Sequence, residues 1–384
     1  MRRIWISAGE LSGDIHGQAL LQALHKREPD LEASGMGGPY LERAGMHTLL
    51  RIEALSVMGL TETFTALPRA FSMLRRIKQE LGERRARGEL DAVVLIDAPD
   101  FNFRVARMAS GFGIPVYYHI PPKVWAWRTG RVRFLRDYTR KIFSILPFEA
   151  DFYKAHGLGE DRVTFVGNPL VDMVDYPSLA SMQPLPRRIG IMPGSRRAEV
   201  TSLMPLFGET ARCLRSARPD IECVCLRAPN IEADALRALW PADVPLTMAE
   251  PETRYRTMRS CAMLLAASGT ATLEAALAGT PTVLAYKVSP LTYAIGKHVV
   301  NIPWVGLPNL ILNREVFPEC LQDKANPEYL AAIASVWLDN PDKLDAVRRD
   351  LDLIRVLCGP PGSADRAARL LLDDLDGLAT QPEI

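Results

Sequence analysis

The sequence lacks several patterns that mark common classes of protein. Its six cysteines include no pair at CxxC spacing and its six histidines no pair at HxH or HxxxH spacing, so we expect neither a metal site nor a disulfide framework. Reduced thiols are typical of cytoplasmic proteins. The chain contains no GxSxG turn and no kinase signature, which leaves an acyl-enzyme or kinase mechanism without its basic parts.

Long hydrophobic runs and an excess of charge are absent as well. The apolar stretch that follows the basic N-terminus ends before Ala8, too early for a signal peptide, and no window approaches the roughly 18 apolar residues of a membrane span. The 46 Lys and Arg residues balance 45 Asp and Glu residues, so no overall field attracts nucleic acid. We therefore expect a cytoplasmic protein whose contact with any membrane is peripheral.

The first half of the chain alternates between strands and helices. We expect strands at Arg3–Ser7, Ala92–Asp97, Val116–His119, Lys141–Ile145 and Thr164–Val166, each followed by a helical stretch, the first of them about Asp14–Arg27. Residues 91–97 form an apolar run with charges only at its ends, as expected of a strand buried on both faces. The alternation predicts an α/β fold with a parallel, doubly wound sheet.

A second domain of the same type follows a segment rich in proline and serine. We interpret Met173–Arg188 as an extended interdomain linker, and we expect further strands at Arg188–Met192, Glu222–Arg227, Met263–Ala267 and Thr282–Tyr286. After about Glu328 the chain is predicted to be helical, with a break at Gly359–Gly362. The predicted domains are 1–172, joined by C-terminal helices of about 350–384, and 188–349. Two such sheets would face each other across a ligand-binding cleft.

The turn after the first strand, Ser7–Gly17, has features of a binding site. Gly9 and Gly13 permit close approach of the backbone, and the helix that follows offers free N–H groups but no GxGxxG pattern. Glu10 and Asp14 disfavour phosphate in this turn and suit recognition of sugar hydroxyls. The alternative is structural, with Ser12 or Asp14 acting as a helix cap.

Two turns in the second domain have the character of a phosphate site. Ile191–Glu199 brings Ser195, Arg196 and Arg197 beside a glycine. Ala267–Glu274 repeats this arrangement with Ser268, Gly269 and Thr270. Two helix N-termini in one cleft suit a diphosphate, and Glu274, one helical turn further on, suits a ribose diol. Alternatively, Glu274 only compensates the helix dipole.

Two stretches are locally basic. Leu67–Gly88 contains seven Lys and Arg residues against two Glu residues and has the apolar spacing of an amphipathic helix, which could also be an ordinary solvated one. Lys123–Lys141 contains seven Lys and Arg residues against one Asp, with Trp125 and Trp127 among them. Such mixtures occur in single-stranded nucleic-acid sites and on surfaces that bind anionic lipid, and composition does not distinguish the two.

Seven segments match one known family, in the family's order, between about residues 7 and 322. They are Ala8–Asp14, Ile96–Asn102, Val124–Arg128, Leu146–Glu149, Pro193–Arg196, Ser268–Glu274 and Leu307–Leu310. Together they closely resemble the lipid-A-disaccharide synthases. The resemblance implies an inverting glycosyltransferase of the Gram-negative envelope, with two Rossmann-like domains. Such enzymes transfer 2,3-diacylglucosamine from UDP to the 6-hydroxyl of 2,3-diacylglucosamine 1-phosphate. Asn168 departs from the family, whose members often have histidine there.

The resemblance implies roles for residues in the turns described above. One carboxylate must take the proton of the acceptor hydroxyl while UDP leaves, and Asp100 is the first candidate, followed by Asp97 and Glu10. The residues expected to bind UDP are Ser195, Arg196, Ser268, Gly269, Thr270 and Glu274. Those expected to bind sugar or acceptor are Gly9, Ser12, Asn309 and Gln322. We expect no metal and no cofactor, because preorganised hydrogen bonds can meet the charge of departing UDP.

The expected partners are the two lipid substrates and the inner-membrane surface, and not nucleic acid. Because both substrates carry acyl chains, Leu67–Gly88 and Met58–Phe64 are expected to dock on the cytoplasmic face of the inner membrane. Alternatives among enzymes are a transferase that adds N-acetylglucosamine to a lipid-linked peptidoglycan precursor and a UDP-sugar epimerase. The alternative outside enzymes is a nucleic-acid or lipid-surface binding protein that uses Lys123–Lys141.

Overall fold

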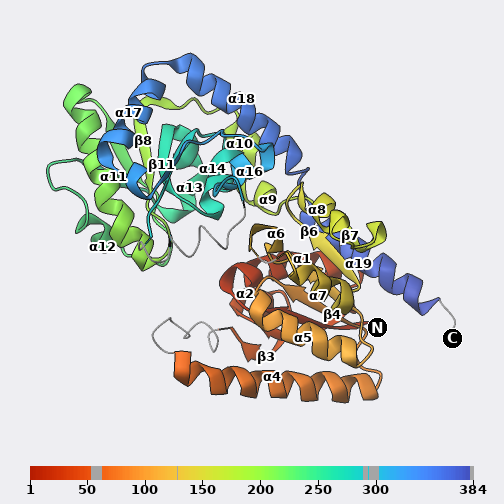
Figure 1. The fold of residues 1–384 in the computed structure, drawn as a ribbon. Coiled ribbons are helices and arrows are strands. Elements are labelled where there is room, and N and C mark those ends of the chain that lie inside the picture. Colours follow the sequence, from red (N-terminus) through yellow and green to blue (C-terminus); the bar gives the residue numbers. More distant parts are fainter. Residues whose placement is uncertain (53–62, 128, 289–292, 294–301, 381–384) are drawn as a thin grey trace. The chain divides into compact units, whose positions relative to one another are not determined.

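The chain folds into two α/β units, each built around one parallel sheet (Figure 1). In this computed structural model the described residues are 1–52, 63–127, 129–288, 293 and 302–380, with the backbone alone over 63–70. The first unit comprises Met1–Pro169 and Pro360–Ile384, and the second comprises Leu170–Gly359. Residues 58–62 of the segment expected to dock on a membrane lie outside the described residues, and so does Arg128.

The first sheet has seven parallel strands in the order β3-β2-β1-β4-β5-β6-β7. Their bounds are β1 Arg3–Ala8, β2 Glu32–Gly37, β3 His47–Arg51, β4 Ala92–Ile96, β5 Val116–His119, β6 Lys141–Ser144 and β7 Val163–Phe165. The five strands predicted from the sequence are confirmed to within one residue at each end. β2 was missed because it contains two glycines and no β-branched residue. β3, which pairs with β2 and with no other described strand, was missed with it.

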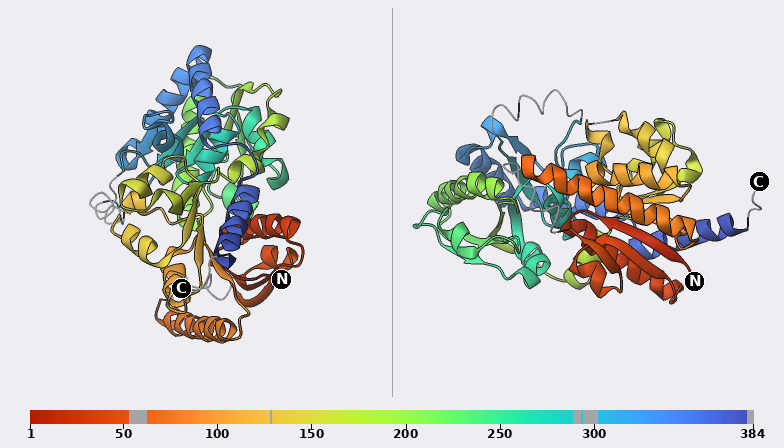
Figure 2. Two further views of the ribbon diagram at one scale, coloured as in Figure 1. Left: turned by 90° about the vertical axis from the view of Figure 1, so that its right-hand side faces the viewer. Right: turned by 90° about the horizontal axis from the view of Figure 1, so that it is seen from below.

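Helices cover both faces of this sheet (Figures 1 and 2). α1 (Leu11–Arg27), α2 (Pro39–Arg43) and α19 (Ser363–Ala379) pack on one face, and α4 (Thr63–Ala86), α5 (Pro99–Gly111), α7 (Arg131–Tyr138) and α8 (Glu149–Ala155) pack on the other. Val94 and Ile96 of β4 face the first group, whereas Val93 and Leu95 face the second. This strand is buried on both sides, as the apolar run predicted. The short elements α6 (Val124–Trp127) and η1 (Glu160–Arg162) complete the unit.

The second sheet has six parallel strands in the order β10-β9-β8-β11-β12-β13. Their bounds are β8 Leu185–Met192, β9 Glu222–Cys225, β10 Leu246–Met248, β11 Cys261–Ala267, β12 Thr282–Tyr286 and β13 Glu319–Leu321. The helices are α9 Leu170–Val174, α10 Tyr176–Leu179, α11 Arg197–Ala217, α12 Ala233–Arg237, η2 Pro251–Thr253, α13 Arg254–Ser260, α14 Thr270–Leu277, α16 Leu307–Leu312, η3 Gln322–Lys324, α17 Pro327–Leu338 and α18 Pro341–Leu357. The predicted pair of doubly wound sheets is thus confirmed. The sequence missed β10 and β13, which are only three residues long.

The segment expected to be an extended linker has structure of its own. It contains α10 and the first residues of β8. The ring of Tyr176 lies 3.2 Å from the guanidinium carbon of Arg355, a cation–π contact that holds the segment against α18 of the same unit. The boundary between the units near the C-terminus also differs from the prediction, which assigned residues from about 350 onward to the first domain. Residues 350–359 belong to the second unit because α18 packs on α14 and α16.

The C-terminal helix α19 returns to the first unit, where it lies beside α1 (Figure 2). Leu371, Leu372 and Leu375 of α19 join the buried cluster that α1 shares with β1 and β4. All six cysteines are free thiols. Within the described ranges, no helix combines the length and apolar character that crossing a membrane requires.

Candidate functional site

The three candidate bases follow two neighbouring strands of the first unit. β1 pairs with β4 on one side and with β2 on the other, so the direction of winding reverses between β1 and β4. Glu10 follows the carboxyl end of β1, and Asp97 and Asp100 follow that of β4. In open α/β sheets ligands bind outside the carboxyl ends of the strands at this kind of switch point.

The two turns at this switch point touch each other. A Cβ atom on Gly9 would lie 2.4 Å from the Cβ of Ala98, so only glycine allows the contact. Asn102 locks the same region: its side-chain N–H groups donate to the carbonyls of Ser7, Ile96 and Asp97, and its Oδ1 accepts from the Ser7 hydroxyl at 2.7 Å. Sequence reasoning assigned Asn102 no role, although it lies in a matched motif.

Asp97 lies in a strained turn and is partly buried, and burial changes the pKa of its carboxylate. Its backbone and that of Ala98 are left-handed, with φ of 49° and 44°, a conformation that costs non-glycine residues on the order of 1 kcal/mol or more each. The Tyr118 hydroxyl and Asn102 both donate to the Asp97 carbonyl and hold this turn. Burial raises the pKa of Asp97, against the opposing effects of a hydrogen bond from the Ala98 N–H and the charge of Lys123.

Asp100 lies in a different environment, three residues further on. α5 begins at Pro99, so Asp100 lies in the first turn of this helix and is not its N-cap residue. The carboxylate is 75% exposed and pairs with Arg131 of α7 at 2.7 Å. The chain turns directly before Pro99, where the backbone of Ala98 is left-handed.

The remaining polar residues of the first turn, Glu10, Ser12 and Asp14, differ in their exposure to solvent. Glu10 and Ser12 are exposed at the start of α1. Asp14 is fully buried, and its carboxylate accepts hydrogen bonds from the backbone N–H groups of Gly38, Tyr40 and Leu41. It therefore caps α2 and not its own helix. These three contacts account for the buried Asp14 carboxylate without a sugar ligand.

Two histidines lie beside these turns. His119 ends β5, next to Ile96, and is buried, with no hydrogen-bond partner for its Nδ1 atom among the described residues. Burial, together with the nearby His16, lowers the pKa of His119 to about 3, and burial lowers that of His16 to about 4. Both imidazoles are therefore neutral at pH 7. No three His, Cys, Asp or Glu side chains within the described ranges are grouped as metal ligands.

The candidate phosphate turns lie at the corresponding switch point of the second sheet. β8 pairs with both β9 and β11, and Met192 lies opposite Ala266, so the turns that follow these two residues are neighbours. In the first turn, the Glu199 carboxylate accepts from the N–H groups of Ser195 and Arg196, both at 3.3 Å, and pairs with the Arg196 guanidinium at 2.9 Å. Glu199 thus fills part of the anion site that this helix N-terminus offers.

The second turn keeps its N–H groups available. Gly269 caps α14, and no side chain of the described residues accepts from the first N–H groups of that helix. Thr270 and Gly269 are exposed, and Ser268 is half-buried with its hydroxyl 3.4 Å from the Val305 carbonyl. Glu274 pairs with Arg254 of α13 at 2.8 Å, so it does more than balance the helix dipole.

Asn309 and Gln322, the two weaker candidates for sugar contacts, are tied into the backbone. Asn309 is fully buried; it donates to the Phe317 carbonyl and to Glu319, and it accepts from the N–H groups of Val316 and Phe317. A sugar contact would have to replace one of these bonds. Gln322 makes a pair of hydrogen bonds with the backbone of Val288.

The buried pair of Trp125 and Glu149 gives a structural role to two of the matched segments, Val124–Arg128 and Leu146–Glu149, to which no catalytic role was assigned. The Glu149 carboxylate accepts from the indole N–H of Trp125 at 3.0 Å and from the backbone N–H groups of Ile145 and Leu146. Trp125 is therefore part of the core, whereas Trp127 is exposed. Burial raises the pKa of Glu149 against these hydrogen bonds. Asn168, the departure from the family noted in the sequence, is buried and donates to the Ile145 carbonyl.

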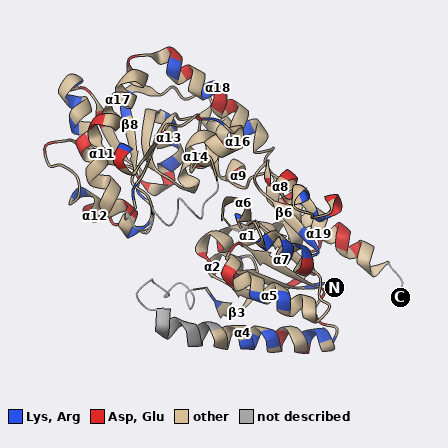
Figure 3. Ribbon diagram, in the orientation of Figure 1, with Lys and Arg blue, Asp and Glu red and all other residues tan. Residues whose placement is uncertain are grey.

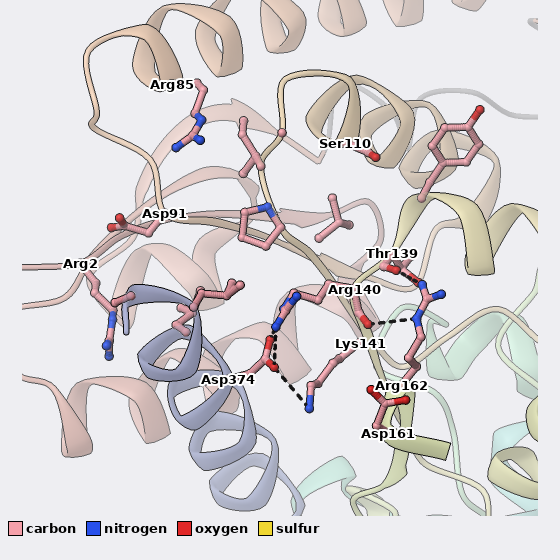
Figure 4. Close-up of a pocket in the computed structure, with 18 of the residues that line it drawn as sticks. Arg2, Arg85, Asp91, Ser110, Thr139, Arg140, Lys141, Asp161, Arg162 and Asp374 are labelled. Carbon is pink, nitrogen blue, oxygen red and sulfur yellow. Dashed lines mark hydrogen bonds and ion pairs between the residues drawn. The ribbon is translucent and has the colours of Figure 1, made fainter. Parts of the chain in front are cut away.

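A cavity of about 800 Å³ lies at the amino ends of the strands of the first sheet, opposite to the end that carries the candidate bases (Figure 4). Its lining includes Asp91, Val116 and Lys141, which lie at the amino ends of β4, β5 and β6. None of the candidate site residues lines it. Arg140 and Lys141 point toward Asp374 of α19, which forms ion pairs with both. These three polar groups of the cavity thus serve the docking of α19.

Comparison with known proteins gives a consistent result. The family model described as lipid-A-disaccharide synthetase matches residues 4–356. The lipid-A-disaccharide synthase of Geobacter sulfurreducens is 36% identical over 384 residues, covering 97% of each chain. That of Pseudomonas aeruginosa is 38% identical over 362 residues, covering 91% of this chain and 94% of its own.

Solved structures with the same fold are more distant in sequence. MurG of Acinetobacter baumannii superposes with a TM-score of 0.60 at 15% identity, covering 97% of this chain and all of its own. The UDP-GlcNAc 2-epimerase of Neisseria meningitidis, solved with UDP-GlcNAc, superposes with a TM-score of 0.62 at 14% identity and the same coverage. These likenesses extend over both units and identify the glycosyltransferase-B type of fold with two Rossmann-like domains.

Proposed function

Because the chain belongs to the lipid-A-disaccharide synthase family, we propose that its donor is UDP-2,3-diacylglucosamine and its acceptor 2,3-diacylglucosamine 1-phosphate. The chain is an inverting hexosyltransferase. The products of the proposed reaction are the β-1,6-linked lipid A disaccharide 1-phosphate and UDP. The observation that carries this proposal is the match over nearly the whole chain, together with carboxylates at one switch point and helix N-termini at the other.

Asp97 is the general base of the proposed reaction. A base must be ionised at neutral pH and strong enough to take the proton of a sugar hydroxyl, which a moderately raised pKa favours. The half-buried Asp97, whose pKa is raised, meets this requirement better than the exposed Asp100, which pairs with Arg131. Asp100, the first candidate from the sequence, then has the role of orienting Arg131. Glu10, exposed at the start of α1, ranks third.

The negative charge of departing UDP is met in the second unit. The open N-terminus of α14, with Ser268, Gly269 and Thr270, supports binding of the diphosphate, because its N–H groups face no competing side chain among the described residues. Arg196 swings from Glu199 to a phosphate oxygen; its side chain is 82% exposed and free to move. Ser195, the residue before Arg196, also binds the diphosphate in this proposal. Glu274 binds the ribose diol while it remains paired with Arg254.

The direct sugar and acceptor contacts of the proposal come from the first unit, and two residues of the second unit act indirectly. Gly9 allows the two turns to touch, and the Ser12 hydroxyl is exposed beside them. Asn309 and Gln322 act indirectly, by holding the loops that contain Phe317 and Val288. We place the enzyme at the cytoplasmic face of the inner membrane, bound peripherally, since both proposed substrates carry acyl chains.

A turnover assay with defined lipids tests this proposal. The purified protein should release UDP and form a disaccharide from UDP-2,3-diacylglucosamine and 2,3-diacylglucosamine 1-phosphate. UDP-N-acetylglucosamine, without acyl chains, should give no product with a peptidoglycan-precursor acceptor and should not be epimerised. Disaccharide formation only with the non-acylated donor, or binding of nucleic acid without any transfer, would replace the proposal by one of those activities.

A further inference from the structure

A groove of about 680 Å³ lies in the first unit between α4, α5 and α7. We call it the α4–α5–α7 groove. A volume of this size suits a single small molecule rather than a macromolecule. Asp100, at the amino end of α5, is part of its lining. The groove therefore reaches the switch point of the first sheet, where Asp97 and Asp100 follow β4.

The floor of the groove is apolar. Leu74 comes from α4, Phe103 and Met108 from α5, and Phe134 from α7, while Phe71 of α4 lies at the mouth. The rings of Phe103 and Phe134 lie 4.6 Å apart and are tilted by 31°, which makes a continuous aromatic wall. Phe71 is 63% exposed although it belongs to a well-packed helix. Exposed aromatic surface at the mouth of a groove is a cost to the free protein, and an apolar ligand would remove it.

The rim of the groove is cationic. Arg75 and Lys78 of α4, Arg104 and Arg107 of α5 and Arg131 of α7 line it, against the single carboxylate of Asp100. Figure 3 shows Lys and Arg on these three helices. Arg75, Lys78 and Arg104 make no ion pair with any described residue, so their charges are not neutralised within the described part of the chain.

Two of the arginines are already oriented. The guanidinium of Arg107 lies over the rings of Phe134 and Tyr138, at 5.4 and 5.3 Å from their centroids. That of Arg131 lies 5.2 Å from the centroid of Phe103 while it pairs with Asp100. Stacked guanidinium groups keep their N–H edges available, and these edges match the oxygens of a phosphate.

We infer that the α4–α5–α7 groove binds the lipid acceptor, with one acyl chain over Phe71, Leu74 and Phe103 and the phosphate at Arg104 and Arg107. This inference rests on the proposed function, which gives the acceptor its chains and its phosphate. An apolar floor with an unbalanced cationic rim is complementary to one molecule that carries both groups. The donor is the poorer fit, because its diphosphate is matched by the α14 N-terminus in the second unit. Arg104 and Arg107 are then specificity residues for the acceptor.

The test separates the acceptor phosphate from the donor. The double variant Arg104→Gln, Arg107→Gln removes two exposed charges, and Arg27→Gln, at the exposed end of α1, is the control within the same unit. Initial rates in detergent micelles give KM for each substrate, with the acceptor supplied with and without its 1-phosphate. The acceptor KM should rise about tenfold or more, as expected for the loss of one charge-assisted hydrogen bond, while the donor KM changes less than about twofold.

Selectivity supplies the decisive measurement. The parent and Arg27→Gln should prefer the phosphorylated acceptor, and the double variant should lose most of this preference. Equal preference in all three proteins, or a rise in donor KM alone, would overturn the inference. A double variant that keeps its acceptor KM in micelles but no longer sediments with anionic vesicles would also overturn it, in favour of a membrane-docking surface.

The apolar part is tested by chain length. Phe71→Ser changes a side chain that is mostly exposed, so the fold should be kept. The variant should lose the parent's preference for acceptors with long acyl chains over short ones, and an unchanged preference would remove the acyl chain from this groove. If the parent forms no disaccharide at all, the proposed function fails by itself. Titration of parent and double variant with dispersed 2,3-diacylglucosamine 1-phosphate then still decides whether the groove binds it.

Discussion

At the scale of single residues, the choice of the general base depends on two aspartates that lie three positions apart. Asp97→Asn should lower turnover by roughly 10²- to 10⁴-fold, because the general base is lost. Asp100→Asn should lower turnover far less, since its carboxylate is exposed and pairs with Arg131. Melting temperature, UDP affinity and turnover of both variants are measured side by side, and the UDP affinity of each should match that of the parent.

The pH profile gives a second readout for the same pair. Because burial raises the pKa of Asp97 above its ordinary value of 3.8, the acid limb of kcat/KM should lie at a higher pH than an ordinary aspartate would give, and it should disappear in Asp97→Asn. If Asp97→Asn turns over within about threefold of the parent while Asp100→Asn loses the acid limb, the roles of the two residues are exchanged.

Arg196 tests the binding of UDP. Arg196→Ala should weaken UDP binding by about 1.5–3 kcal/mol, the value of a hydrogen bond to a charged group. Calorimetric titration with UDP measures this difference. Arg197→Ala, the neighbouring residue in the first turn of α11, is the control for a general loss of positive charge. Equal UDP affinity in Arg196→Ala and the parent, with equal turnover, would remove Arg196 from the site.

At the scale of elements, α19 depends on one carboxylate, that of Asp374, whose side chain is only 9% exposed. Asp374 pairs with Arg140 and Lys141 and accepts from the Tyr117 hydroxyl at 2.6 Å. Asp374→Asn should lower the stability of the first unit by on the order of 2 kcal/mol at pH 7. Asp373→Asn changes a 62% exposed neighbour on the same helix and should have little effect. Urea unfolding gives the midpoint of each variant. Equal midpoints for Asp374→Asn and Asp373→Asn would contradict the assigned role of Asp374.

The same carboxylate predicts a pH dependence. Burial opposes ionisation of Asp374, but hydrogen bonds from Arg140 and Tyr117 outweigh it and lower its pKa below the ordinary value of 3.8. A lowered pKa in the folded state stabilises the fold above the unfolded pKa, and this stabilisation is lost as the pH falls through the folded pKa. The difference between parent and Asp374→Asn should therefore be largest near neutral pH and shrink below about pH 4.

At the scale of the whole molecule, the basic surface of α4 predicts binding to anionic membranes. Arg84, one of the charges in this stretch, is used by the fold, because it donates to the Ser34 hydroxyl and pairs with Glu80. Arg75, Arg76 and Lys78 are exposed. Each contributes about 1 kcal/mol near an anionic surface, so changing all three to Glu should abolish sedimentation with anionic vesicles, and so should high salt.

A control with the same change of charge separates this surface from net charge. Lys26, Arg27 and Lys154 are exposed cations of the same unit, on α1 and α8, and their replacement by Glu should leave sedimentation nearly unchanged. Equal losses in both triple variants would show that only the total charge matters. Binding that is indifferent to salt and to both triple variants would exclude an electrostatic attachment.

The architecture and the family could be predicted from the sequence because both depend on local pattern. Apolar runs such as that of β4 are recognisable within a few residues, and so are the glycine turns at Gly9 and Gly269. Short matched segments are sufficient to identify the lipid-A-disaccharide synthase family, because each lies within a few consecutive residues. The sequence did not predict strands that lack the usual β-branched and aromatic residues. β2 is an example, and its pairing with β1 compensates for its two glycines.

The tertiary structure decided which polar groups remain for chemistry. Asp14 and Asn309 resemble binding residues in the sequence, but their hydrogen bonds go to backbone groups elsewhere in the fold, at Gly38 and Phe317. Asp97 and Asp100 differ little in local sequence, yet burial raises the pKa of one and Arg131 pairs with the other. The α4–α5–α7 groove joins residues from 71 to 134. Burial and long-range partners set the energy of a polar group, and these exist only once the chain has folded.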